Sequence, residues 1–134
     1  MSRIIDLGRD LAGLVTLEGR GPHTTEEEAQ DSFMKLADFR DGALFAASFS
    51  GSSGWERHLK GDEIVQILEG STRLDIIVGD ERESHHLSAG MLLVVPQGCW
   101  HQFFSDDGVK VLTATPQPTE HLHVDDPRTL PDTG

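Results

Sequence analysis

Short apolar stretches alternate with turn-forming residues along most of the chain, from Phe33 to Thr115. The breaks between them are rich in Gly, Asp, Ser and Pro, a spacing typical of strands joined by tight turns. The pattern predicts about eight or nine strands, over Phe33–Phe39, Ala43–Phe49, Trp55–His58, Glu63–Glu69, Thr72–Val78, Glu83–Leu87, Met91–Val95, His101–Phe104 and Val109–Thr115. Many short strands of this kind favour an all-β sandwich or barrel over a parallel sheet covered by helices.

The expected strand Glu63–Glu69 is largely apolar on both of its faces. Alternate residues point to opposite sides of a strand, which places Val65 and Ile67 on one side. Ile64 and Leu68 lie on the other side. A strand buried on both sides needs a second cover beyond the barrel interior, either the N-terminal segment or another subunit. We expect a homodimer.

The two ends of the chain lack this strand pattern. Near the N-terminus, Thr25 and Glu28 have the spacing of a capping box, which predicts one short helix. After Thr115, prolines and a pair of aspartates predict an irregular segment that runs over the surface. We therefore expect an N-terminal extension over residues 1–32, a barrel domain over residues 33–115 and an irregular tail over residues 116–134.

The net charge narrows the choice of partners. With 11 Lys+Arg and 23 Asp+Glu, the 134 residues carry a formal charge of −12 at pH 7 with His neutral. This charge repels phosphate backbones and anionic lipid headgroups, so neither nucleic acid nor a membrane is an expected partner. The single cysteine, Cys99, excludes an internal disulfide, and the first residues lack the apolar segment of a secretory signal. We expect a cytoplasmic protein.

Residues 56–63 place imidazole and carboxylate groups close together in the sequence. On the expected strand Trp55–His58, the period of two puts Glu56 and His58 on one face. If the turn at residues 60–62 returns the chain as a hairpin, Glu63 comes back beside His58. Imidazole nitrogen and carboxylate oxygen together suit Fe(II), Mn(II), Ni(II) or Zn(II).

A third ligand must come from elsewhere, and His101 is the candidate. It opens a strand directly after the turn at residues 96–100, which can aim a side chain inward. Spacing alone does not place His101 beside His58, and a single histidine is more often a surface or hydrogen-bonded structural residue. Both interpretations remain open from the residues alone.

Two stretches resemble the sequence motifs of the cupin family. The stretch from Gly54 to Glu63, closing at Gly70, is similar to the first motif, which carries an H-x-H, then a Glu and a later Gly. The stretch that begins at Gly90 and ends at His101 is similar to the second motif, with its Pro and Gly at matching positions. The resemblance covers roughly residues 33–115.

This resemblance implies a fold and a site. The fold is a double-stranded β-helix, a jelly-roll-like barrel, in agreement with the strand pattern. In cupins the two motifs face one another and their side chains converge on a metal ion. Carried over by position, the implied metal ligands are His58, Glu63 and His101.

Three positions depart from the family motifs. Glu56 takes the place of the first histidine, Ser50 stands where the first motif opens with Gly, and Ser105 replaces the Asn that usually ends the second. Including Glu56 makes the ligand set two histidines and two carboxylates, which favours Fe(II), Mn(II) or Zn(II). Alternatively Glu56 withdraws and leaves the other three as a facial triad with open positions, or metal affinity is lost and the barrel is only a binding pocket.

The remaining histidines and the cysteine are weaker candidates. His85 and His86 are adjacent, so one faces inward and one outward, and we expect both to be structural or solvent-facing. His121 and His123 have the spacing of a ligand pair, but in the expected tail surface positions are favoured. No base pairs with Cys99 by spacing, which favours a thiol that is buried or at the pocket rim.

Two classes of function fit such a site. The first is a metal-dependent enzyme that acts on a small organic molecule in an apolar pocket, by dioxygenase-, lyase- or isomerase-type chemistry, with Glu63 as a ligand that also shuttles a proton. The second is a non-catalytic module that binds or senses a small molecule or a metal ion. An open coordination position favours the enzyme, whereas a closed site of four protein ligands favours binding alone.

Overall fold

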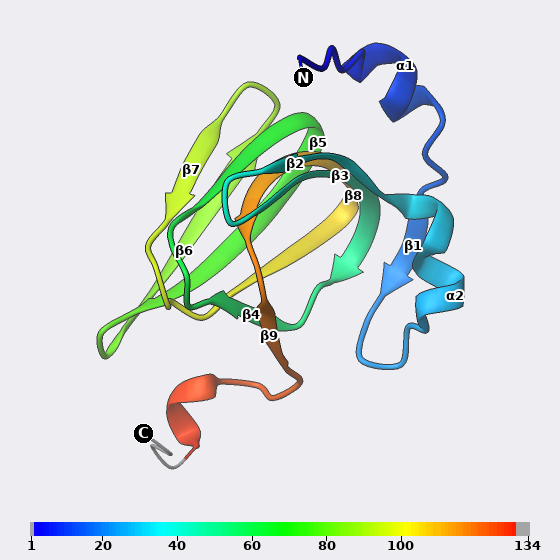
Figure 1. Cartoon of the computed structure of the whole chain (residues 1–134). Helices are drawn as coiled ribbons and strands as arrows, with labels where there is room; N and C mark the ends of the chain where they lie inside the picture. The colour runs from blue at the N-terminus through cyan, green and yellow to red at the C-terminus, as the bar shows by residue number, and fades with distance from the viewer. Residues whose placement is uncertain (1, 131–134) are drawn as a thin grey trace.

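The computed structural model describes residues 2–130, which form a curled β-sheet with short helices at both ends (Figure 1). The strands are β1 (Leu17–Arg20), β2 (Phe33–Phe39), β3 (Gly42–Ser52), β4 (Trp55–His58), β5 (Glu63–Val78), β6 (Glu81–Ser88), β7 (Leu92–Val95), β8 (His101–Pro116) and β9 (Thr119–Leu122). The helical segments are α1 (Leu7–Ala12), α2 (Glu26–Ala29), η1 (Gln30–Ser32) and η2 (Pro127–Thr129). The predicted all-β fold is confirmed.

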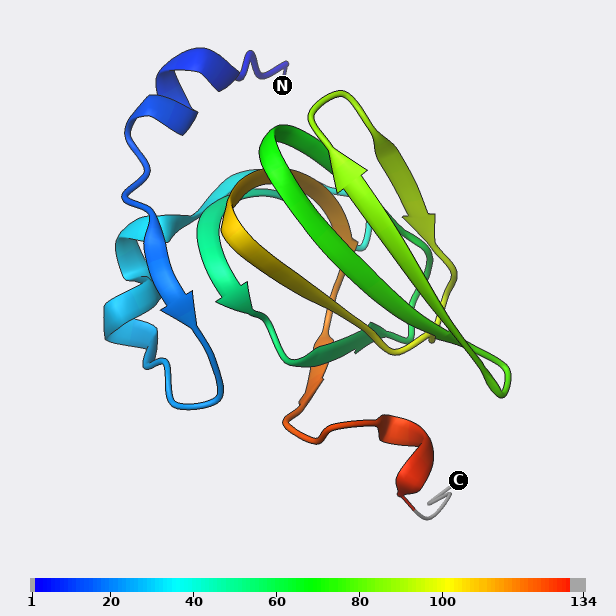
Figure 2. The same cartoon turned by 180° about the vertical axis from the view of Figure 1, so that it is seen from behind.

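The sheet curls into a barrel because β8 pairs with two long strands. It pairs antiparallel with β3 on one side and with β5 on the other. Strands β6 and β7 pair with β5, and β2 pairs with β3. Seen from the front and from behind, these strands surround one interior (Figures 1 and 2). That interior holds the core, which includes Phe49, Val65, Ile67, Leu74, Phe103, Val109 and Val111.

In two places the sequence predicted two strands where the structure has one, namely β5 and β8. The pairing of β5 with β8 shifts register on either side of Gly70. Gly70 has a φ of 75°, and a Cβ there would overlap the carbonyl oxygen of Gly108. The turn-forming residues therefore bend two continuous strands instead of ending them.

The segment after Thr115 is not wholly irregular, contrary to the prediction. Residues Thr119–Leu122 form β9, which pairs antiparallel with β4 and places Thr119 opposite His58. The nearby prolines, Pro116 and Pro118, lie before β9 and do not interrupt its hydrogen bonding. Part of the tail, β9, therefore belongs to the sheet and lies beside β4, which carries the candidate site residues Glu56 and His58.

The N-terminal part contains more structure than the sequence predicted. The helix α2 begins with the expected capping box of Thr25 and Glu28. Two elements were not predicted: α1, which Asp6 caps, and β1, whose four residues show no alternation. Strand β1 runs parallel to β3 and brings Arg20 opposite Gly51. Within residues 2–130 the structure has no helix with the length and apolar character needed to cross a membrane.

One face of β5 and β7 lies on the outside of the barrel. The side chains of Ile64, Leu92 and Val94 are 40%, 55% and 52% exposed, while Val65 on the inner face is fully buried. Within one chain, β5 is therefore not covered on both sides. The homodimer expected from its two apolar faces stays a prediction.

Candidate metal centre

Three buried side chains meet at one end of the barrel. His58 ends β4, Glu63 begins β5 and His101 begins β8. Their exposed fractions are 3%, 4% and 0%. The imidazole rings of the two histidines lie 5.2 Å apart between centroids. The structure therefore brings His101 to His58 and Glu63, from which it is far apart in the chain, and the three are the residues that the sequence proposed as ligands.

The inward atoms of these residues lack hydrogen-bond partners. Glu63 Oε2 lies 3.2 Å from His58 Nε2, and Glu63 Oε1 lies 3.1 Å from His101 Nε2. These are ion-pair distances, but the geometry is not that of a hydrogen bond. His58 Nε2, His101 Nε2 and Glu63 Oε1 are buried without a hydrogen-bond partner. Two nitrogens and an oxygen therefore face one another in a buried site.

The route by which Glu63 reaches His58 differs from the predicted hairpin. Strand β4 does not pair with β5; it pairs with β8 and β9. Glu63 is held from the other side, because β5 pairs with the far end of β8 and places Ile64 opposite Ala114. The turn at residues 60–62 therefore does not bring Glu63 beside His58 by a hairpin. Strand β8, which contributes His101 at its start, is the element that links them.

A second set of groups fixes the orientation of these side chains. Thr115 donates a hydrogen bond to Glu63 Oε2 over 2.6 Å, and the Thr113 and Thr115 hydroxyls lie 2.8 Å apart. His101 Nδ1 lies 3.1 Å from the carbonyl oxygen of Cys99, which can only accept. His101 therefore carries a proton on Nδ1, and in its neutral form Nε2 has a free lone pair.

A threonine hydroxyl of the tail, which can donate or accept, holds the ring of His58. The Nδ1 atom of His58 lies 3.0 Å from Thr119 Oγ1 on β9. Thr119 was not predicted because it lies beyond the motifs. Thr115 was not predicted either, although polar residues on the inner face of an apolar strand indicate a site. Such outer partners hold the tautomer and the ring orientation of a ligand.

The charges in the site influence one another strongly. Burial alone would raise the pKa of Glu63, but the imidazoles of His101 and His58 outweigh it and lower that pKa to about 2. Burial likewise opposes the charged form of His101, yet the carboxylates of Glu63 and Glu56 raise its pKa above the ordinary value. Glu63 is therefore a carboxylate at neutral pH, as a metal ligand must be.

Glu56 lies at the edge of this site. Ligand atoms of Glu56, His58 and His101 all lie within 4.8 Å of one another. Glu56 is less buried than the histidines, and its Oε1 lies 3.7 Å from Arg20 Nη2 on β1. Its carboxylate is therefore shared between the candidate metal position and a cation that the sequence analysis did not single out.

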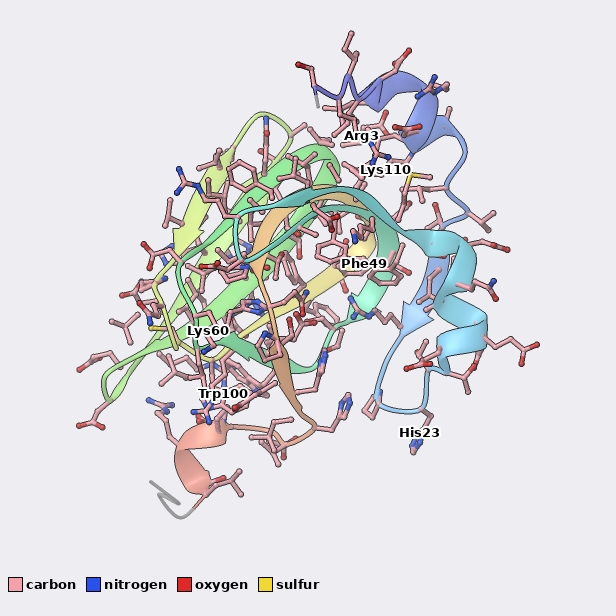
Figure 3. All side chains as sticks on the ribbon, viewed as in Figure 1. Arg3, His23, Phe49, Lys60, Trp100 and Lys110 are labelled. Atoms are coloured by element: carbon pink, nitrogen blue, oxygen red, sulfur yellow. The ribbon has the colours of Figure 1, made fainter. Side chains whose placement is uncertain are left out.

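A pocket of about 200 Å³ adjoins the site inside the barrel. Four phenylalanines give it a largely apolar wall, and Figure 3 shows Phe49 within the curl of the sheet. Polar and charged side chains line it as well. The phenylalanines are Phe33, Phe45, Phe49 and Phe103, and the polar residues include Arg20, Glu56, Glu63, Thr115, Thr119 and His121.

The side chains of the other candidate residues are not part of the buried cluster of His58, Glu63 and His101. His85 contacts Glu83 at 2.9 Å on β6, and His86 is exposed. His121 and His123 are both exposed, and His121 lies opposite Glu56 on β9 and lines the pocket. Cys99 is half-buried, and burial raises the pKa of its thiol, which does not favour a reactive thiolate.

The fold and the two facing motifs define a class of barrel protein, and comparison with known families agrees. The family described as "Cupin domain" matches residues 49–115, so the chain belongs to the cupins. A cupin-2 domain protein from Shewanella frigidimarina superposes over 85% of this chain and 95% of its own, with a TM-score of 0.57 and 21% identity. The predicted family is confirmed.

Two curated relatives are named as enzymes. An acireductone dioxygenase of Rhodopseudomonas palustris strain CGA009 is 34% identical over 82 residues, which is 61% of this chain and 47% of that protein. The acireductone dioxygenase of strain TIE-1 is 32% identical over 94 residues, or 70% of this chain and 54% of that protein. The chain thus spans about half the length of the curated relatives it matches.

A solved dioxygenase shares the fold. The hydroquinone 1,2-dioxygenase of Sphingomonas sp. TTNP3, with 4-hydroxybenzoate bound, superposes over 64% of this chain and 65% of its own. The TM-score is 0.55 at 14% identity. At this identity the likeness concerns the barrel alone.

Proposed function

We propose that this cupin is a metal-dependent enzyme that acts on a small organic molecule, with His58, Glu63 and His101 as its metal ligands. The observation that carries the proposal is the set of three buried atoms without hydrogen-bond partners, two imidazole Nε2 and one carboxylate oxygen, that face one another. A buried polar atom without a partner is costly, and a divalent cation would satisfy all three at once.

The residues fit such a cation in charge and in chemistry. Both histidines are held by their Nδ1 atoms, which leaves Nε2 for a metal. Two imidazoles and one carboxylate form the facial donor set typical of non-haem Fe(II) oxygenases, and it also suits Mn(II), Ni(II) and Zn(II). Bound there, the cation would supply Lewis acidity and, for a redox metal, activation of O2.

The protein supplies the rest of the chemistry. Thr115 donates a hydrogen bond that orients the Glu63 carboxylate, and four phenylalanines give the pocket an apolar wall for the carbon skeleton of a substrate. Glu63 was predicted as a proton carrier, and its low pKa makes it a weak base in the metal-free protein. Its first role in this proposal is therefore that of a ligand.

Dioxygenase chemistry is the branch that the relatives favour. The curated relatives are named acireductone dioxygenases, and a hydroquinone 1,2-dioxygenase shares the fold. Both names describe the attack of O2 on an electron-rich, oxygen-substituted carbon skeleton. We therefore propose a small enediol- or phenol-like substrate, with lyase or isomerase chemistry as the alternatives at the same ligands.

A non-catalytic binding module is the second candidate, and the position of Glu56 favours it. As a second carboxylate and fourth protein ligand near the two histidines, Glu56 would close the site, and a closed site holds a metal without offering it to a substrate. The contact of Glu56 with Arg20 favours the open site instead, because it draws the carboxylate away from the histidines.

Oxygen consumption tests the proposal. Protein loaded in turn with Fe(II), Mn(II), Ni(II) or Zn(II) is mixed with panels of enediols, diketones and catechols, and the His101→Ala variant serves as the control. Turnover that requires His101 is the expected result. Full metal occupancy with no turnover of any panel, monitored also for lyase and isomerase products, would instead establish the binding module.

A further inference from the structure

We propose that Arg20 binds the anionic group of the ligand, so that the pocket is specific for small carboxylates or other organic anions. This inference deepens the proposed function, because it names the substrate class of the same site. It stands on Arg20 itself, which comes from the N-terminal strand β1, outside the residues 49–115 that match the family.

Arg20 is a largely buried cation on an aromatic surface. Its side chain is 18% exposed, and its guanidinium carbon lies 4.7 Å from the ring centroid of Phe33 and 4.9 Å from that of Phe49. The two rings are stacked with centroids 6.2 Å apart. Contact with two ring faces fixes the plane of the guanidinium group and reduces the entropy that binding would cost.

The donors of this guanidinium group are not used within the described part of the chain. Its single charged contact is Glu56 Oε1, at 3.7 Å from Nη2, which is too long for a hydrogen bond. The group makes no hydrogen bond with any residue between 2 and 130. The Arg20 nitrogens are not among the fully buried atoms without a partner, so the five N–H donors of this fixed fork open to the pocket and are available to an acceptor.

The pocket offers the place for that acceptor. Arg20 lines it together with Glu56 and Glu63, and four phenylalanines form its apolar wall. Its volume of about 200 Å³ is below the range of roughly 300–1,000 Å³ typical of drug-sized ligands, so the ligand is small. A planar carboxylate matches the fork of an arginine with two parallel hydrogen bonds.

The chain is shaped to hold Arg20 at this position. Gly51 on β3 lies opposite Arg20 and has a φ of 89°. A Cβ at residue 51 would overlap the backbone oxygen and nitrogen of Arg20. The glycine that lies one residue after the expected motif position therefore allows β1 to approach β3 closely.

The Glu56 carboxylate competes with an incoming anion for contact with Arg20. This carboxylate lies between the histidines and Arg20 and contacts the guanidinium weakly. An incoming anion would replace this long contact with direct hydrogen bonds. Removing the charge of Glu56 should therefore strengthen anion binding, while removing Arg20 should abolish it.

Calorimetry with simple probes tests this inference. Acetate and benzoate, each compared with its neutral amide, are titrated into the protein as purified and again after treatment with EDTA. Wild type should prefer the carboxylates to the amides by about tenfold or more. Arg20→Met should lose the preference, Arg20→Lys should retain part of it, and Glu56→Gln should raise the affinity for the carboxylates.

Matched controls separate this test from the metal proposal. Arg9→Met removes an exposed arginine and should leave binding unchanged, and near-ultraviolet circular dichroism checks that each variant is folded. A carboxylate preference that persists in Arg20→Met, or no carboxylate binding by wild type, overturns the inference. Because the titration is repeated without metal, a protein that holds no metal but loses anion binding in Arg20→Met would refute the proposed function alone.

Discussion

Thr115 donates a hydrogen bond to Glu63 Oε2 across the β5–β8 pairing, over 2.6 Å. The hydroxyl proton of Thr115 is used in that bond, so the Thr113 hydroxyl, 2.8 Å away, donates to Thr115. A chain of two hydroxyls thus ends at the carboxylate. It fixes Glu63 between two imidazoles and stabilises its charge where burial opposes it.

Thr115→Val should weaken metal binding while keeping the side-chain volume. Loss of a partner of a metal ligand typically costs about 10–100-fold in metal affinity. Competition with a chelator measures the change. Thr113→Val touches the carboxylate only through Thr115 and should have a smaller effect. Equal metal affinity in Thr115→Val and wild type would show that the hydroxyl does not orient a ligand.

The unfolding free energy of the metal-free protein should fall as the pH rises above 6.5. The folded-state pKa of His101 is raised, so its contribution is fully present below the unfolded value of 6.5 and is lost as the pH rises through the folded pKa. For Glu63 the folded pKa is lowered from 4.5 to about 2, so its contribution is present above 4.5 and is lost as the pH falls towards 2.

Urea unfolding of EDTA-treated protein across this range measures both slopes. The His101→Asn variant should lose the decline at alkaline pH, because its side chain does not titrate. A wild-type stability that is flat or increases above pH 6.5, with the same profile in the variant, would contradict the ion pair between His101 and Glu63.

Gly51→Ala should destabilise the protein more than Gly90→Ala does. Both glycines have a positive φ, of 89° and 92°, so both substitutions cost about 1–3 kcal/mol of backbone strain. Only at Gly51 does the added Cβ overlap the backbone of Arg20, whereas nothing lies within 4 Å at Gly90. Overpacking should add about 1–3 kcal/mol at Gly51. Equal losses in urea unfolding would refute the close approach of β1 to β3.

Local strand and turn signals were sufficient for the barrel, whereas the proposed ligand set needed the resemblance to the cupin motifs, because spacing alone did not place His101 beside His58. The period of two placed Glu56 and His58 on one face of β4, and the structure brings their ligand atoms together. The turn-forming residues correctly predicted where the chain bends, but they wrongly predicted that strands end there, since β5 continues through Gly70. Only the paired partner strand distinguishes a bend from an end.

The residues around the proposed ligands could not be predicted from local sequence patterns. Thr119 and Arg20 come from opposite ends of the chain, and each reaches the site by pairing with a strand that the sequence does not name as its partner. Their isolated stretches carry too few residues for a periodic pattern. Tertiary pairing, which spacing does not encode, decided their roles.

The metal content of the protein tests directly whether His58 and His101 bind a divalent metal ion. Wild type should carry about one divalent ion per chain when loaded with Fe(II), Mn(II), Ni(II) or Zn(II) and then desalted. His58→Ala combined with His101→Ala should retain less than about a tenth of that, while His86→Ala combined with His123→Ala, which removes two exposed imidazoles, should match wild type. Equal metal content in wild type and in the His58, His101 double variant would contradict the account.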